Sequence, residues 1–214
     1  MNMLYKGKPI YKAALTENPE ETGMYYVSLV EDPAVESNFL AFEKADETKP
    51  LNFKVENEEK RIVTGLLMAA DRPILRQDFS GLYYILYDKE TIIAMAERFL
   101  AMGLANNVDT AHNFEVEEGV FLREMYIKDS ERGISPAGFE DVEEGSLFAT
   151  YHILNDEVWN KVKAGEFKGF SLAGIFYEEE FKKVETEEDD ITEEEYQELL
   201  SIIDQLNKKL KNDI

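Results

Sequence analysis

Short apolar and aromatic runs, separated by turn-forming segments, fill most of the first 181 residues. They are rich in Val, Ile, Tyr and Phe, which suit the pleated and half-buried surface of a sheet. The pattern therefore predicts a fold built mainly from strands. The segment ADRPILRQDFSG is either a long surface loop or a short irregular strand. The predicted strands are residues 23–30, 38–44, 51–55, 61–69, 81–87, 120–128, 147–154 and 171–181.

Two segments have the periodicity of a helix. Residues 91–102 carry apolar side chains at spacings of three and four and are followed by a glycine, which predicts a helix with one face in the core. Residues 155–165 predict a second, shorter helix, with Asn155 or Asp156 as its N-cap and a glycine as its C-terminal stop. The polar segment 103–119 is predicted to be a loop. The predicted fold class is α+β and mostly β.

The composition excludes several classes of protein. Of 214 residues 44% are hydrophobic, enough for a packed core, and no cysteine is present, which removes disulfides and thiolate catalysis. Acidic residues outnumber basic ones by 45 to 23, and a net charge of −22 argues against binding to a nucleic-acid backbone. No apolar run is long enough to span a membrane, and the N-terminus lacks the apolar core of a signal peptide. We therefore expect a soluble protein that stays in the cytoplasm where it is made.

The C-terminal part of the sequence differs from the rest. Residues 178–195 hold eleven Asp or Glu residues and two Lys residues, which is typical of a solvated linker and also compatible with an electrostatic docking segment. Thr192 and Glu195 form a capping-box pattern ahead of a short helix. We therefore expect a β-rich domain at 1–181 and an acidic linker with a helical tail at 182–214. The apolar seam of that helix follows heptad spacing at Tyr196, Leu199, Ile203, Leu206 and Leu210.

The residues available for chemistry are few. The sequence has no glycine-rich phosphate loop, no EF-hand spacing, and no close pair of histidines for zinc. Hydrolysis by an activated serine remains, since Ser171 and His112 are each predicted at the entrance of a strand and could meet as nucleophile and base. The alternatives are a turn hydroxyl at Ser171 and an exposed loop histidine at His112. His152, in the middle of a predicted strand, fits a half-buried packing residue.

Three stretches resemble the XkdF-type serine proteases of tailed phages, a branch of the prohead (capsid maturation) proteases. They are YYVSLVEDPAVESNFLAF, TAHNFEVEEGVFLREMYIKD and HILNDEVWNKVKAGEFKGFSLAGIF, in that order along the chain. The resemblance implies a fold like the herpesvirus assemblin proteases, a β-barrel flanked by helices. It also implies that His112 is the general base and Ser171 the nucleophile. This chain departs from the family pattern at Ala173, where the family usually has an acidic residue.

A third group should orient the imidazole of His112. Glu124 is the first choice, because it lies on the strand that follows His112 in the sequence. His152 is the second, by analogy with a Ser-His-His triad, and Glu178 is the third. Each of the three also fits an ordinary solvent-facing position on a strand.

The resemblance implies a phage capsid maturation protease, a serine endopeptidase packaged inside the assembling procapsid in the host cytoplasm. Its partners would be the major capsid protein and the scaffold protein, both as substrates, and it could also cleave itself. It implies no metal and no organic cofactor. The helical tail could dock the enzyme in the shell or pair with a second copy. The alternative is a catalytically inactive assembly or structural protein of the virion that has kept the protease fold.

Overall fold

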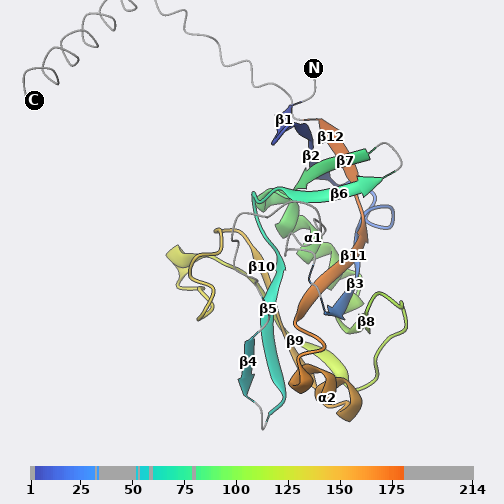
Figure 1. Cartoon of the computed structure of the whole chain (residues 1–214), viewed down its shortest axis with the longest axis vertical. Coiled ribbons are helices and arrows are strands. Elements are labelled where there is room, and N and C mark those ends of the chain that lie inside the picture. Colours follow the sequence, from blue (N-terminus) through green and yellow to red (C-terminus); the bar gives the residue numbers. More distant parts are fainter. Residues whose placement is uncertain are drawn as a thin grey trace, which may run out of the picture. The chain divides into compact units, whose positions relative to one another are not determined.

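The computed structural model describes residues 3–31, 33, 52, 54–57, 60–78 and 81–180 (Figure 1). All of them belong to one compact unit, Met1–Phe181. The predicted strand 38–44 and the predicted acidic linker and helix at 182–214 lie outside the described residues.

The described elements follow the predicted order, with additional strands at the N-terminus and in the segment 103–119. They are β1 (Leu4–Tyr5), β2 (Lys8–Ala14), β3 (Gly23–Val30), β4 (Lys54–Asn57), β5 (Ile62–Met68), β6 (Ile74–Asp78), β7 (Gly81–Leu86), α1 (Lys89–Ala101), η1 (Leu104–Asn106), β8 (Val108–Thr110), β9 (Val120–Ile127), η2 (Ser130–Arg132), β10 (Leu147–Ile153), α2 (Asp156–Ala164), β11 (Gly169–Ile175) and β12 (Tyr177–Glu180).

The strands in the described ranges pair into three sheets. One has the order β1-β2-β7-β6, with β12 also on β2; the second is β4-β5-β10-β9; the third is β11-β3-β8. The fold is thus mostly β with two α-helices, as predicted. The strands of the described residues do not close into the expected barrel, and that prediction is corrected. Periodicity predicts strands, whereas closure depends on which strands pair, and here the pairing stops at the edges of each sheet.

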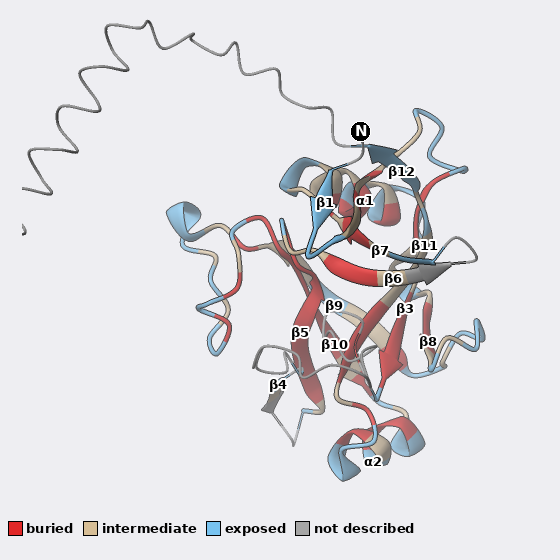
Figure 2. Cartoon of the chain, turned by 45° about the horizontal axis from the view of Figure 1, so that its top comes forward, coloured by how far each residue is buried: buried red, intermediate tan, exposed pale blue. Residues whose placement is uncertain are grey.

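The core lies where β5 and β10 pair and where α1 packs onto β3 and β10 (Figure 2). Every residue of β5 is buried, and Tyr151 of β10 packs against Phe170 of β11, with ring centroids 5.1 Å apart. The predicted stripe of the first helix is confirmed, since Ile92, Met95, Ala96 and Phe99 are buried. This core holds the second and third sheets together.

Both predicted helices are confirmed, and their caps explain their bounds. The first begins at Lys89, two residues earlier than predicted, because the Asp88 side chain accepts a hydrogen bond from the Thr91 amide at 2.9 Å. The second is capped by Asn155 and ends at Gly165, whose φ of 72° is the left-handed conformation of a C-terminal stop. Neither helix, nor any other in the part of the chain that the structure describes, is long and apolar enough to cross a membrane.

The last predicted strand, 171–181, is in fact two strands in different sheets. Residues of β11 pair with β3, and those of β12 pair with β2. The register shifts between Ala173 and Gly174, where a Cβ on the glycine would lie 2.3 Å from the Gly23 carbonyl oxygen. Only glycine fits so close to the neighbouring backbone. Ser171 therefore lies inside a strand, and its predicted place at a strand entrance is wrong.

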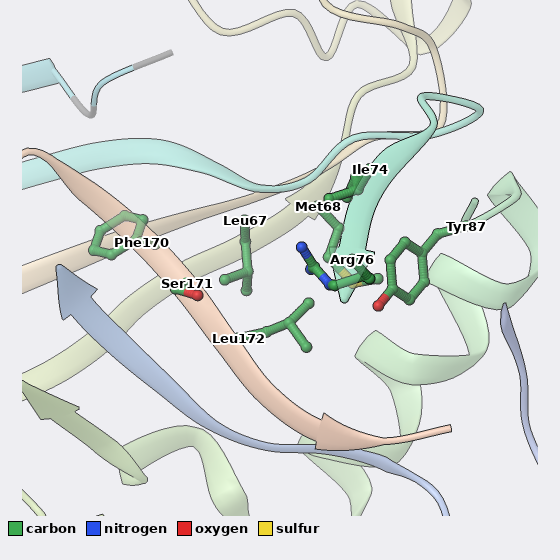
Figure 3. A pocket seen from close by; sticks show the side chains of 8 residues that line it. All are labelled: Leu67, Met68, Ile74, Arg76, Tyr87, Phe170, Ser171 and Leu172. Carbon is green, nitrogen blue, oxygen red and sulfur yellow. The ribbon is translucent and has the colours of Figure 1, made fainter. Parts of the chain in front are cut away.

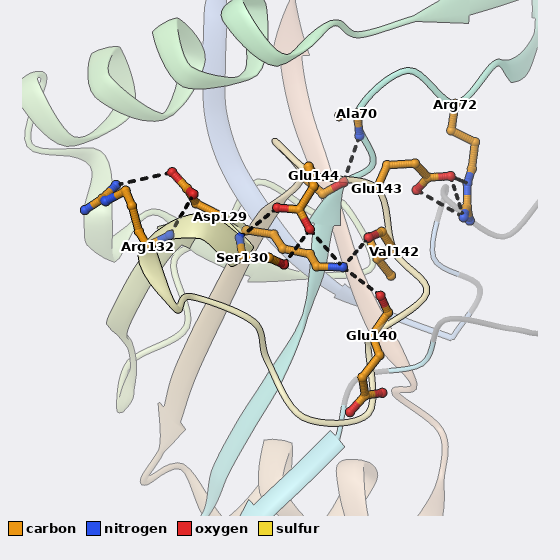
Figure 4. A network of polar contacts seen from close by, with 11 residues as sticks. Ala70, Arg72, Asp129, Ser130, Arg132, Glu140, Val142, Glu143 and Glu144 are labelled. Carbon is orange, nitrogen blue, oxygen red and sulfur yellow. Dashed lines mark hydrogen bonds and ion pairs between the residues drawn. The ribbon is translucent and has the colours of Figure 1, made fainter.

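The long loop after β9 contains Glu140, Val142 and Glu144 (Figure 4), and all three contact one buried lysine. Lys128 is 3% exposed, and its ammonium donates hydrogen bonds to the backbone carbonyls of Glu140 (2.7 Å) and Val142. It also lies 3.5 Å from the Glu144 carboxylate. Because a buried ammonium needs partners for its protons, these contacts fix the return path of the loop.

Candidate active site

Three polar residues lie side by side across the third sheet. Ser171 on β11 is the register partner of Ser28 on β3, and Ser28 is in turn the partner of Asp109 on β8. Directly paired residues of neighbouring strands project to the same face of a sheet, with Cβ atoms about 4.5–5.5 Å apart. The three are 4%, 0% and 0% exposed. The sheet thus carries a buried polar row on one face.

The opposite face of the same sheet is apolar. The neighbours of the polar row along each strand are Val27, Leu29, Val108 and Phe170, all of which belong to the main hydrophobic core. Side chains alternate between the two faces of a strand, so the core holds one face in place while the polar row faces the other way. Packing of the core therefore fixes the spacing of the three polar groups.

His112 lies just beyond the end of β8 and turns back over the polar row. Its Nδ1 is 2.9 Å from the Ser28 hydroxyl oxygen. The backbone on either side is held down, because the Ala111 amide donates to the Leu29 carbonyl (2.9 Å) and the Phe114 amide donates to Asp109 Oδ2 (2.7 Å). The turn thereby presents the imidazole to the middle strand.

This turn is conformationally strained. Ala111, His112 and Phe114 have φ values of 52°, 57° and 60°, the left-handed region that non-glycine residues rarely adopt. Each such residue costs about 1–2 kcal/mol. The strain is held by the hydrogen bonds to Leu29 and Asp109, and strain of this kind concentrates at functional sites, where it fixes a side chain in one position.

The surroundings of Ser171 are nearly closed (Figure 3). Its hydroxyl makes no hydrogen bond within the described residues, so the hydroxyl proton has no competing acceptor there. A cavity with about 10 Å³ of free space, room for roughly one water molecule, lies beside it. Burial raises the pKa of Tyr87, so this phenol stays neutral. The other residues that line the cavity are Leu67, Met68, Ile74, Arg76, Phe170 and Leu172.

The structure brings the predicted base and nucleophile to the same sheet. His112 follows β8, Ser171 lies on β11, and Ser28 on β3 separates them. The imidazole hydrogen-bonds Ser28, which is the register partner of Ser171, and the two predicted catalytic side chains are not themselves hydrogen-bonded in the structure. Catalytic hydrogen bonds are often long or poorly aligned before substrate binds.

The structure does not bring the three candidate orienting groups to His112. Glu124 lies on β9 of the second sheet, with an exposed side chain 3.5 Å from Arg123. His152, on β10, packs edge-to-face on Phe121 with ring centroids 5.1 Å apart. Glu178 is exposed on β12. The recorded partner of His112 is Ser28 instead.

Sequence reasoning did not single out Ser28 or Asp109. Ser28 is the one small hydroxyl in the apolar strand GMYYVSLV, a signal that could have been followed. Asp109 lies in a segment predicted as a loop, where the structure has the three-residue strand β8. Its burial depends on pairing with β3, which local sequence does not reveal.

Comparisons with known proteins identify the family of this chain. The family model described as "Putative phage serine protease XkdF" matches residues 50–180, more than half of the chain. The chain belongs to this family of phage serine proteases. Both His112 and Ser171 lie inside the matched region, and Ser28 lies outside it.

One curated relative adds to this assignment. The "Phage-like element PBSX protein XkdF" of Bacillus subtilis (strain 168) is 30% identical over 162 residues, which cover 75% of this chain and 50% of the relative. The chain thus spans about half the length of that relative. No solved structure matches.

Proposed function

We propose that the chain is a serine endopeptidase, with Ser171 as nucleophile and His112 as general base. The observation that carries the proposal is the polar row, in which the His112 imidazole hydrogen-bonds Ser28, the register partner of Ser171 on the adjoining strand. Membership of a family described as phage serine proteases supports the same chemistry.

In this proposal each proton transfer involves a named atom. Because Nδ1 of His112 is engaged by Ser28, Nε2 is the nitrogen that takes the hydroxyl proton of Ser171. The serine oxygen attacks the carbonyl carbon of the scissile peptide, and the imidazolium then gives its proton to the leaving amine. Water, deprotonated by the same nitrogen, hydrolyses the acyl-enzyme and restores Ser171.

We further propose a role in capsid maturation, with the scaffold protein, the major capsid protein or the chain itself as substrate inside the procapsid. The support is the resemblance to prohead proteases and the relative's origin in a phage-like element. In this proposal the acidic segment and heptad helix at 182–214 recruit the enzyme to the shell. Its high negative charge suits a basic partner surface.

A catalytically inactive assembly protein is the second candidate. Two observations favour it: Ser171 is 4% exposed, and its hydroxyl is not hydrogen-bonded to His112. Ala173, where the family usually has an acidic residue, points the same way. In that case the buried row would serve only to hold the third sheet together.

Labelling with a fluorophosphonate separates the two candidates, because the reagent reacts with an activated serine. We expect one adduct, mapped by peptide mass spectrometry to Ser171 and absent from Ser171→Ala and His112→Ala. Ser130→Ala, a change at a serine hydrogen-bonded to the exposed Glu144, is the matched control and should label normally. An adduct on Ser28 would assign the nucleophile to that residue, and no adduct on a folded protein would support the inactive candidate.

A further inference from the structure

We propose, resting on the function proposed above, that Ser28 and Asp109 together position His112, with Ser28 linking the imidazole to the buried carboxylate. The order along the sheet is Ser171, Ser28, Asp109, and His112 closes over it. The group that orients the base is thus a hydroxyl backed by a carboxylate.

The hydrogen bonds that the Ser28 hydroxyl must accept and donate lead to this assignment. A base that works through Nε2 carries its own proton on Nδ1, so the Ser28 oxygen accepts the 2.9 Å hydrogen bond. The hydroxyl hydrogen of Ser28 then needs an acceptor of its own, because a buried donor without a partner costs free energy. Ser28 is fully buried, so bulk water does not supply that acceptor.

Asp109 supplies the missing acceptor. Its Oδ2 accepts from the Phe114 amide at 2.7 Å, whereas its Oδ1 is buried and has no hydrogen-bond partner among the described residues. Asp109 is the direct register partner of Ser28 on the parallel strand, so both side chains project from the same face. Rotation of the two short side chains closes an O–H···O bond between Ser28 and Oδ1, and each buried polar atom then has a partner.

Asp109 also fixes the backbone that carries the base. Its hydrogen bond to Phe114 spans the left-handed residues Ala111 and His112 and holds the strained turn closed. One carboxylate thus sets both the backbone of the turn and, through Ser28, the orientation of the ring. This dual role explains a buried acid that pairs with no Lys or Arg in the described part of the chain.

The link through Ser28 changes none of the proton transfers in the proposed reaction. When Nε2 takes the proton of Ser171, the Nδ1 proton stays on the ring and the Ser28 hydrogen stays on its oxygen. The negative charge of Asp109 stabilises the transient imidazolium through the intervening hydroxyl, and Asp109 itself takes up no proton. Ser28 and Asp109 are therefore positioning residues, and only Ser171 and His112 exchange protons with the substrate.

The test uses the full chain and the fact that it has two histidines. In a Ser171→Ala background, ¹⁵N NMR of the imidazoles should show neutral His112 with its proton on Nδ1. Asp109→Asn keeps an oxygen for the Phe114 amide but loses the charge, and Ser28→Ala removes the link. Both should convert His112 to a mixture of tautomers, whereas His152, on another sheet, should not change.

Kinetics supply a second measurement in the active background. Asp109→Asn and Ser28→Ala should lower the fluorophosphonate labelling rate by about 10²–10⁴-fold in a chain that stays folded, and Ser28→Thr, which keeps the hydroxyl, should recover most of it. Thr150→Val, which breaks the 2.7 Å hydroxyl pair with Thr64 in the second sheet, is the matched control. It should not alter the His112 tautomer.

The outcomes separate this proposal from the function on which it rests. A neutral His112 protonated on Nε2 in the parent chain, or a tautomer unaffected by Asp109→Asn and Ser28→Ala, would overturn the link. A chain that is never labelled but shows the expected tautomer changes would refute the protease and leave the link standing.

Discussion

Replacing Lys128 by Met should destabilise the domain far more than replacing an exposed lysine. The methionine keeps most of the aliphatic stem but removes an ammonium that donates to two backbone carbonyls, those of Glu140 and Val142. A hydrogen bond from a charged donor is worth about 1.5–3 kcal/mol, and the two bonds together imply a loss of about 3–6 kcal/mol. The loss is reduced by the desolvation cost that the buried charge no longer bears, so we expect about 3 kcal/mol.

The measurement is urea unfolding with thermal melting of the same samples. For a domain of this size about 3 kcal/mol corresponds to a fall of roughly 6–12 °C in melting temperature. Lys161→Met is the matched control: that side chain is 39% exposed and pairs with Glu157 at 3.3 Å, a surface pair on a helix worth about 0.3–0.5 kcal/mol. Equal losses in the two variants would refute the idea that the buried lysine holds the loop after β9.

Four other predictions concern the site and the fold. Ser171→Ala and His112→Ala should each abolish cleavage of co-expressed capsid or scaffold protein, and the double variant should be hardly worse, as gel analysis of the products would show. Asp88 is desolvated, but hydrogen bonds to a lysine and to the first turn of α1 lower its pKa. Its contribution to the free energy of unfolding is therefore present near neutral pH and lost as pH falls from about 5 through that lowered pKa. Asp88→Asn should therefore make the free energy of unfolding, measured against pH, fall less steeply on the acid side. Gly174→Ala should cost about 1–3 kcal/mol in urea unfolding, because the new Cβ meets a backbone carbonyl of β3 at 2.3 Å. A chain ending at Phe181 should melt at nearly the same temperature but enter purified procapsids poorly; a large drop in melting temperature with normal incorporation would contradict the docking role.

The local sequence pattern was sufficient to predict a strand or helix where the residues that determine it lie within one short segment. The strand 23–30 was predicted with the bounds that β3 has. The helix at 155–165 was predicted from its cap and its final glycine, and the structure has both. Such features depend on residues a few positions apart, so a single stretch of sequence carries them.

The pairing of strands could not be predicted in the same way. Residues 171–181 look like one strand, yet the chain leaves β3 after Ile175 and joins β2 from Tyr177 onward. Alternation along a strand does not say which neighbour it will meet, so the sequence revealed neither this division nor the open sheets of the described residues. The strand β8 was missed for a related reason, since three residues become a strand only by pairing with β3.

The sequence by itself determined which residues could do chemistry: it has two histidines, no cysteine, and a serine in GFSL, a stretch that resembles the family. Only the tertiary structure decided which groups surround them. Ser28 and His112 are 84 positions apart in the chain, and they meet because β3 is inserted between β11 and β8. Burial then removes bulk water as an alternative partner, so the register of three strands leaves Ser28, in place of Glu124, next to His112.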